Sequence, residues 1–257
     1  MAKTLDEPTR ARAGLWSLPV VSWALYDLAN TIFSMNIVSF FFGLWIVSVM
    51  GFSDSVFAWT TSGSYAVIFL LSPFLGALTD QASRRMPFLM VSTAVCVAFT
   101  LLLGWQSVGL SLAFFAIANI AYQSGLQFYD ALLPEVSTEE NRGRVGGFGI
   151  GLGYLGSFIG LFTARWLIGD TEGVPTAELS ERYRTVFQVS AALFLAFALP
   201  CFLFVRERVR PSRFGRGAIA AAGRQVVRTF REIRDFPGPG RFMIGRVVYT
   251  DAVNTVI

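Results

Sequence analysis

Several long apolar stretches dominate this 257-residue chain and decide what it can fold into. A helix needs about 20 residues to cross the roughly 30 Å hydrocarbon layer of a membrane. Six stretches reach that length, and another begins near Phe242 and continues to Ile257; the six cover residues 18–48, 56–79, 87–106, 109–133, 145–168 and 184–205. Because 54% of the residues are hydrophobic and only 15% are charged, the sequence indicates a membrane protein that contacts the lipid bilayer.

The apolar stretches are continuous, whereas the strands of a membrane barrel alternate between polar and apolar residues. We therefore expect an all-α polytopic membrane protein. Residues 1–15 are polar and predict a cytoplasmic N-terminal tail rather than a cleaved signal peptide. The expected order is then a six-helix bundle over 16–205, a linker over 206–240 and the start of a seventh transmembrane helix over 241–257.

The linker is rich in arginine and contains apolar residues at helical spacing. This pattern is typical of an amphipathic helix that lies on an anionic membrane surface, and a regulatory partner site is the alternative. Basic residues also gather in every second connection: Lys3, Arg10, Arg12, Arg84, Arg85, Arg142 and Arg144 precede the linker. The positive-inside rule then predicts a cytoplasmic N-terminus, and the net charge of +4 indicates topology rather than nucleic-acid binding.

Several chemistries are excluded by what the chain lacks. It has no histidine, so Ser/His/Asp catalysis and histidine metal sites are excluded. The glycine run at 146–156 has no Lys-Ser/Thr after it and is not a Walker phosphate loop. Cys96 and Cys201 both fall within predicted spans, which argues against a disulfide framework. We expect no enzyme activity, no cofactor and no metal.

Polar residues lie on one face of two predicted helices. In the first helix the face consists of Trp23, Asp27, Asn30 and Ser34, with Tyr26 beside it, and in the fourth of Asn119, Gln123, Gln127 and Asp130. An ionisable side chain at bilayer depth is costly and usually faces a bundle interior or a hydrated cavity. Both faces therefore predict a path for a small polar solute, and interhelical hydrogen bonding that only locks the bundle is the alternative.

Two further polar or small-residue features fall in the fifth helix. Glycines at small-xxx-small spacing predict close helix packing, with a flexing point as the alternative: Gly149, Gly153, Gly156 and Gly160. Arg165 stands one turn from the end of this helix. Snorkelling to the headgroups is expected for it, and contact with an anion is the alternative.

A short internal repeat links the two ends of the chain. The segment "YDLANTIF" from Tyr26 is echoed by "YTDAVNTVI" from Tyr249, so that Asp251 and Asn254 correspond to Asp27 and Asn30. A parallel repeat after six crossings is the pattern of a transporter built from two six-helix halves. Asp251 and Asn254 are therefore further candidates for the solute or proton path.

The connection between the second and third helices, "GALTDQASRR", resembles the cytoplasmic loop signature of the major facilitator superfamily. The matching residues are Gly76, Asp80, Arg84 and Arg85, whereas Gln81 and Ser83 depart from the pattern. The resemblance implies a six-helix N-terminal half and a conformational latch at these four residues. The alternative is a solvated turn whose arginines only fix topology.

Within that superfamily the chain resembles the vacuole effluxer family. The resemblance is carried by "WALYDLANTIFS", "FYDALLPEVS", "GRVGGFGIGLGYLGSF" and "VVYTDAVNT". It implies secondary transport by alternating access, with amino-acid efflux as the expected activity and a C-terminal half of the same protein as the expected partner. An importer of sugars or organic ions and a non-transporting membrane scaffold are the alternatives.

Asp27 has a further expected role. A carboxyl group in a partly dry cavity is a candidate proton carrier, so coupling to protons is expected there. The plasma (inner) membrane is the expected location.

Overall fold

The computed structural model describes residues 14–211 together with 221, 223, 224, 228 and 245. Residues 14–72 and 84–210 form one compact unit, and residues 73–83 belong to a second. The N-terminal tail up to residue 13, most of the predicted linker and the predicted seventh helix lie outside the described residues, and so do Asp251 and Asn254. Within the described part of the chain every regular element is a helix.

Among the described residues, five helical stretches are long and apolar enough to cross a membrane. The first, Leu18–Val49, consists of α2 (Leu18–Phe33), η1 (Ser34–Phe40), α3 (Phe41–Leu44) and η2 (Trp45–Val49). The others are α4 (Asp54–Asp80), α6 (Val108–Asp130), α8 (Arg142–Ile168) and α9 (Thr176–Phe204). A shorter apolar helix, α5 (Met86–Leu101), and the single turn α7 (Leu133–Val136) complete the described set. The predicted all-α membrane fold is confirmed.

The helix ends differ in places from the apolar stretches. Helix α9 begins at Thr176, eight residues before its apolar part, because polar residues extend a helix as readily as apolar ones once it leaves the hydrocarbon. Helix α5 ends at Leu101, several residues before its apolar stretch does. Gly104 follows with φ of +78°, a left-handed conformation that ends a helix at little cost for glycine.

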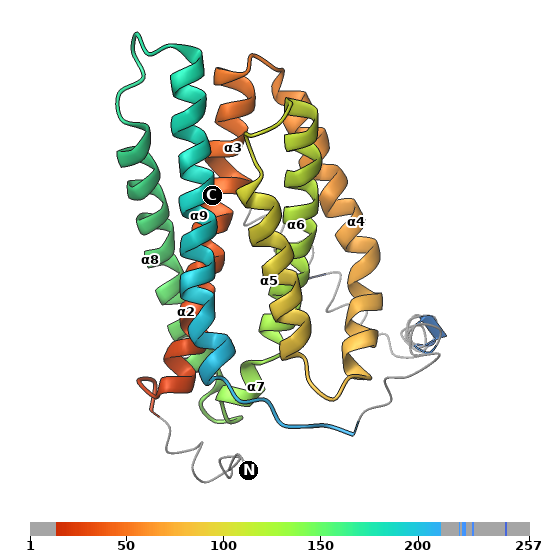
Figure 1. Ribbon diagram of the computed structural model, residues 1–257. Helices are drawn as coiled ribbons and strands as arrows, with labels where there is room; N and C mark the ends of the chain where they lie inside the picture. Colours follow the sequence, from red (N-terminus) through yellow and green to blue (C-terminus); the bar gives the residue numbers. More distant parts are fainter. Residues whose placement is uncertain (1–13, 212–220, 222, 225–227, 229–244, 246–257) are drawn as a thin grey trace. The chain divides into compact units, whose positions relative to one another are not determined.

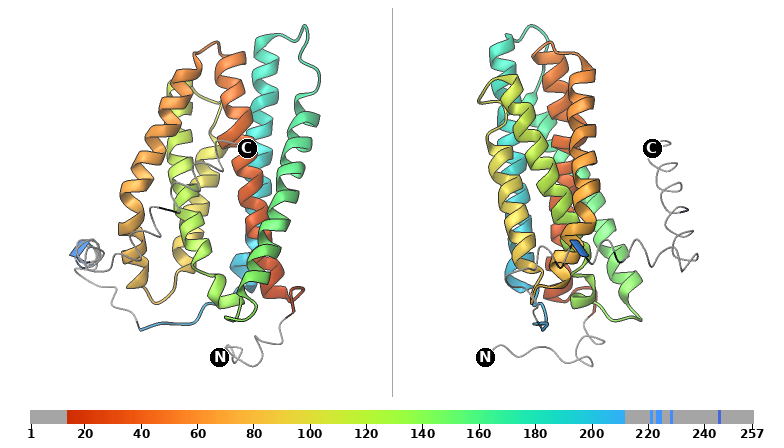
Figure 2. Two further views of the ribbon diagram at one scale, coloured as in Figure 1. Left: turned by 180° about the vertical axis from the view of Figure 1, so that it is seen from behind. Right: turned by 90° about the vertical axis from the view of Figure 1, so that its right-hand side faces the viewer.

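Helix α2 runs alongside α8 and α9 and packs against both (Figures 1 and 2). The buried face of α8 consists almost entirely of small residues: Val145, Gly149, Gly153, Gly156, Gly160, Ala164 and Ile168. A methyl group built on Gly149 would lie 2.7 Å from Trp23 Cζ3, and one on Gly156 would overlap the Leu28 carbonyl oxygen. At Gly156 the backbones of α2 and α8 thus approach too closely for any side chain, whereas at Gly149 the Trp23 ring occupies the space.

Aromatic rings fill the half of the bundle that lies beyond η1. Phe42 stacks on Phe115 with ring centroids 4.8 Å apart, and it contacts Trp45 and Phe187 edge-on or offset. Phe57 of α4 contacts Phe42 and Phe115 from the other side. Because offset and edge-to-face ring pairs add stabilisation beyond area burial, this cluster joins four spans at one end.

The first span is interrupted by two π-helical segments, η1 and η2. Between them Phe40 departs from helical geometry, with φ of −132° and ψ of −75°. A π-turn carries an extra residue per turn, and such turns gather at functional sites. The interruption places Phe40 and Leu44 on the exposed side of the span.

We predict that Gly156→Ala destabilises the bundle by about 1–3 kcal/mol, because the added methyl group meets backbone rather than a movable side chain. Gly151→Ala is the matched control, since nothing lies within 4 Å of its added methyl group on the same helix. Thermal unfolding of both variants in detergent measures the difference. An unfolding temperature for Gly156→Ala equal to that of Gly151→Ala would contradict the packing described above.

Candidate functional site

Asp27 lies in the middle of α2, about a third of the way along the first span, where α2 faces α8. A methyl group on Gly153 would lie 2.9 Å from Asp27 Oδ2 and 3.1 Å from Thr31 Oγ1, so glycine leaves room for both side chains. Thr31 Oγ1 donates a hydrogen bond to the Asp27 carbonyl oxygen at 2.9 Å. The Asp27 side chain is partly exposed, and among the described residues no cation lies within ion-pair distance of it.

Tyr129 of α6 forms an aromatic wall beside this carboxylate. Trp23 stacks on it at 4.6 Å and Tyr26 at 5.0 Å between ring centroids. Trp23 Nε1 also donates to the Tyr129 carbonyl oxygen at 3.5 Å, and the Tyr26 hydroxyl is paired with Thr93 Oγ1 at 2.7 Å. Two of the predicted pathway residues, Trp23 and Tyr26, are therefore buried and firmly held.

Asn30 is the most unusual polar group of this face. It is only 2% exposed, and neither of its side-chain polar atoms has a hydrogen-bond partner in the described structure. Buried amides are nearly always paired, and an unpaired one calls for a functional or structural explanation. Ser34, one turn further, interacts with Tyr122 of α6.

The side-chain amides of α6, which is the fourth predicted helix, lie toward α4. Asn119 Nδ2 donates to Ser64 Oγ at 2.7 Å, and Gln127 both donates to the Ser72 carbonyl oxygen and accepts from Ser72 Oγ. Gln123 interacts with the Tyr65 hydroxyl. Asn119 and Gln127 thus form hydrogen bonds between helices, which is the alternative to a solute path that the sequence left open for them. Asp130 is exposed at the end of α6 and interacts electrostatically with Asp27.

The four residues of the predicted latch fall in separate units. Gly76 and Asp80 belong to residues 73–83, and Arg84 and Arg85 belong to the bundle. Within the 73–83 segment, Thr79 Oγ1 donates to the Gly76 carbonyl oxygen at 2.9 Å. In the bundle, Arg85 Nη1 donates to the Ala131 carbonyl oxygen at 3.1 Å. The latch remains a prediction.

Two carboxylates that the sequence analysis did not single out tie the end of the sixth span to the bundle. Glu207 accepts hydrogen bonds from the backbone N–H groups of Arg85 and Met86 at 2.6–2.8 Å and so caps the N-terminus of α5. Glu135 of α7 is buried and accepts from the Arg208 N–H and from Arg210 Nη2. In the sequence Glu207 stands out only by the arginines on either side of it, and Glu135 only by the proline before it.

Asn36 is a third residue that the sequence analysis missed. Its Nδ2 donates to Ser190 Oγ of α9 at 2.8 Å, and its Oδ1 lies 3.0 Å from a methyl group built on Gly160. An ideal helix would place Asn36 about 180° from Asp27. Both nevertheless face glycines of α8, because the π-turn of η1 changes the helical phase.

The described part of the chain is thus a bundle of apolar helices, five of them long enough to cross a membrane, with a carboxylate on the first that has no cation partner. The chain belongs to the Major Facilitator Superfamily, whose family model matches residues 28–249. This superfamily is one of membrane transporters.

Two curated proteins are similar to the chain. It is 27% identical over 248 residues to the "Uncharacterized MFS-type transporter YxiO" of Bacillus subtilis, covering 92% of this chain and 58% of that protein. It is also 27% identical over 196 residues to an "Uncharacterized protein" of Aquifex aeolicus, covering 76% and 47%. The chain thus spans about half the length of these relatives.

We predict that Gln127→Ala destabilises the bundle by about 1 kcal/mol, because two hydrogen bonds between α6 and α4 are lost. Ser72→Ala, which removes only the bond from Ser72 Oγ, should cost less. Thermal unfolding of the two variants and of their double variant measures the coupling between the residues. Additive effects in the double variant would show that the two side chains do not act together.

We further predict that Glu207→Ala destabilises the bundle by about 1–3 kcal/mol, because it leaves the N–H groups at the start of α5 without an acceptor. Glu139→Ala is the control, since Glu139 is exposed and carries the same charge. Unfolding temperatures in detergent measure both. Equal temperatures for the two variants would show that the cap contributes no stability.

Proposed function

We propose that this protein is a secondary active transporter that moves a small polar solute by alternating access, with the Asp27 face of α2 on the path. The observation that carries the proposal is the Asp27 carboxylate itself, which lies within a membrane span and has no cation partner among the described residues. Such a group is costly at bilayer depth, and packing alone gives no reason for it. Asn30, buried and unpaired three residues further on, supports the same face.

For the cargo and coupling we propose amino-acid efflux driven by protons. The cargo follows from the resemblance of four segments, "WALYDLANTIFS" first among them, to the vacuole effluxer family. The coupling is supported by the position of Asp27, a carboxylate within a span that has no cation partner among the described residues and is therefore a candidate proton site. The latch residues Asp80 and Arg84 would then act on the helix ends as the two halves rock.

We also propose that a C-terminal half of the same protein completes the transporter. The relatives are longer than this chain, and two spans expose large apolar side chains. Trp59, Phe69 and Leu70 of α4 are exposed, as are Tyr154, Phe162 and Trp166 of α8. The second half and the lipid are the two apolar surroundings that would cover these faces. The arginine distribution supports a cytoplasmic N-terminus, and we propose the plasma membrane as the location.

A membrane scaffold is the second candidate function. It is favoured by the hydrogen bonds of Asn119 and Gln127 to α4, which lock the bundle without any solute. Asp27 discriminates the two, because a scaffold has no use for an unpaired carboxylate. A scaffold would move no solute and would tolerate the replacement of Asp27 without loss of folding.

The decisive experiment measures flux in proteoliposomes that contain the protein with its natural C-terminal part. We predict that an imposed pH gradient drives amino-acid movement, and that Asp27→Asn reduces this driven flux at least tenfold because the variant carries no titratable group at that position. Exchange of labelled for unlabelled substrate without a gradient should continue in the variant. Sugars and organic ions are tested in parallel as alternative cargoes.

Asp54→Asn is the control, because Asp54 is an exposed aspartate in the first turn of α4. It should leave the driven flux unchanged. If Asp27→Asn remains fully dependent on the pH gradient, Asp27 is not the proton carrier. If no cargo moves in the unsubstituted protein, the scaffold function is the better account.

A further inference from the structure

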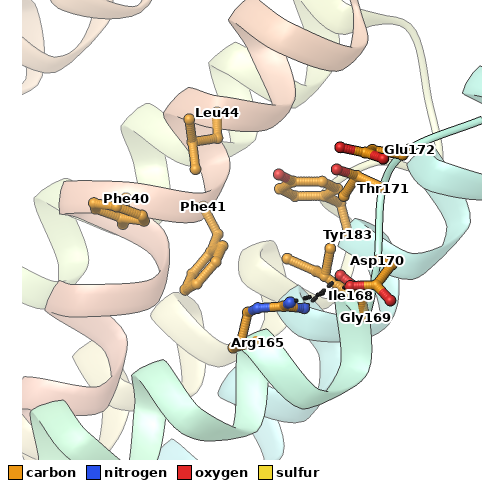
Figure 3. Close-up of a pocket in the computed structure, with 10 residues that line it drawn as sticks. All are labelled: Phe40, Phe41, Leu44, Arg165, Ile168, Gly169, Asp170, Thr171, Glu172 and Tyr183. Carbon is orange, nitrogen blue, oxygen red and sulfur yellow. Dashed lines mark hydrogen bonds and ion pairs between the residues drawn. The ribbon is translucent and has the colours of Figure 1, made fainter.

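A pocket of about 790 Å³ opens at the end of the bundle where α8 and α9 are joined (Figure 3). One wall is the interrupted part of the first span, with Phe40, Phe41 and Leu44. The opposite wall is the last turn of α8 and the connection to α9, with Arg165 and Glu172. We call it the distal pocket, since it lies far along the first span from Leu18. It is separate from the Asp27 face, and neither the family nor the relatives assign a ligand to it.

Arg165 provides the positive charge of the distal pocket. Its Nη1 donates to the Gly169 carbonyl oxygen and its Nη2 lies 3.3 Å from Asp170 Oδ1. The guanidinium has five N–H donors, so these two partners leave donors for a further acceptor. The side chain is also 63% exposed, which leaves it accessible to a ligand. A bidentate Arg is well suited to a phosphate or carboxylate group.

Glu172 and Asp170 both bring negative charge to the distal pocket, and Asp170 is the one that Arg165 already engages. Glu172 belongs to the same wall as Arg165, and Figure 3 shows the two near opposite ends of the group, with Tyr183 between them. Among the described residues no cation pairs with Glu172. Arg182, the next cation along the chain, is engaged by the carbonyl oxygens of Ile168 and Asp170 and by Glu178.

The remaining walls are apolar or aromatic. Phe41 is buried and its ring lies 6.4 Å from that of Tyr183, so the two rings meet at the base of the pocket. Phe40 and Leu44 are exposed at the rim, and Trp166 beside Arg165 is 80% exposed. Tryptophan at the end of a span is typical of the membrane interface. The pocket therefore joins a polar region, with Arg165, Asp170 and Glu172, to an apolar rim at headgroup level.

We propose that the distal pocket binds a zwitterionic phosphoethanolamine group, with its phosphate on Arg165 and its ammonium on Glu172 and Tyr183. A purely anionic group would meet the carboxylates of Glu172 and Asp170, and a purely cationic one would leave the remaining donors of Arg165 without an acceptor. A zwitterion satisfies both charges at once, and an ammonium gains from the face of Tyr183. The source we favour is a phosphatidylethanolamine lipid, because the exposed Phe40 and Leu44 at the rim offer contact to acyl chains.

Native mass spectrometry of the purified protein in detergent tests this proposal. Phosphatidylethanolamine and phosphatidylglycerol with identical acyl chains are titrated separately, and bound lipid is counted per protein. We expect at least fivefold more bound phosphatidylethanolamine, and at least a fivefold loss of it in Arg165→Gln and in Glu172→Gln. Arg165→Lys, which keeps the charge, should lose less than Arg165→Gln.

Arg144→Gln is the matched control, because Arg144 is an exposed arginine at the other end of α8. It should leave the bound phosphatidylethanolamine unchanged, and unfolding temperatures verify that all variants are folded. Displacement of the lipid by soluble phosphoethanolamine at equal concentration would keep the zwitterion chemistry but assign the pocket to a free solute. Equal binding of the two lipids, or unchanged binding in both Arg165→Gln and Glu172→Gln, would overturn the proposal.

Discussion

The close approach of α8 to α2 is the contact on which the rest of the structure depends. In lipid there is little hydrophobic driving force between helices, so association relies on van der Waals packing and interhelical hydrogen bonds. The glycine face of α8 supplies the packing, because Gly149 and Gly156 leave space for Trp23 and for the backbone at Leu28. The same face leaves space for Asp27 at Gly153 and for Asn36 at Gly160. Packing and polar chemistry thus share one helix interface.

Helix α4 is held to the bundle in a different way. It makes few close backbone contacts with the other described helices, and its apolar side chains are largely exposed. Hydrogen bonds from Asn119 and Gln127 of α6 reach it at points two turns apart. Interhelical hydrogen bonds in membranes contribute only about 0.6 kcal/mol on average. The bundle therefore combines one rigid helix pair, α2 with α8, and one span that is joined mainly by polar side chains.

Much of the fold follows from the sequence, because apolar stretches of about 20 residues have few alternatives in a membrane. Asp27 lies opposite Gly153. This agrees with the sequence, because residues three or four positions apart share one face in each of the two helices. The hydrogen-bond partners of polar side chains are harder to predict from the sequence. Nothing in the spacing of Asn119 and Gln127 tells whether they face a cavity or α4, because helical phase gives a direction and not a neighbour.

Two other features could not be predicted from the sequence, for a related reason. The π-turns in the first span change its phase, so that Asn36 could not be assigned to a face by counting residues. Glu207 caps α5 over a separation of more than 100 residues, and such a contact has no local pattern. Both depend on the three-dimensional path of the chain rather than on any short segment.

The segment that follows α9, residues 205–210, affects how force is transmitted along the chain. Glu207 binds the start of α5, and Arg208 and Arg210 bind Glu135 of α7, so this short piece of chain is fastened at two points. Any tension on the chain beyond Arg210 is therefore borne first by these two anchors and reaches α5 and α7 before it reaches α9. Glu207 and Glu135 therefore keep a force on the chain beyond Arg210 from acting directly on α9, the sixth span.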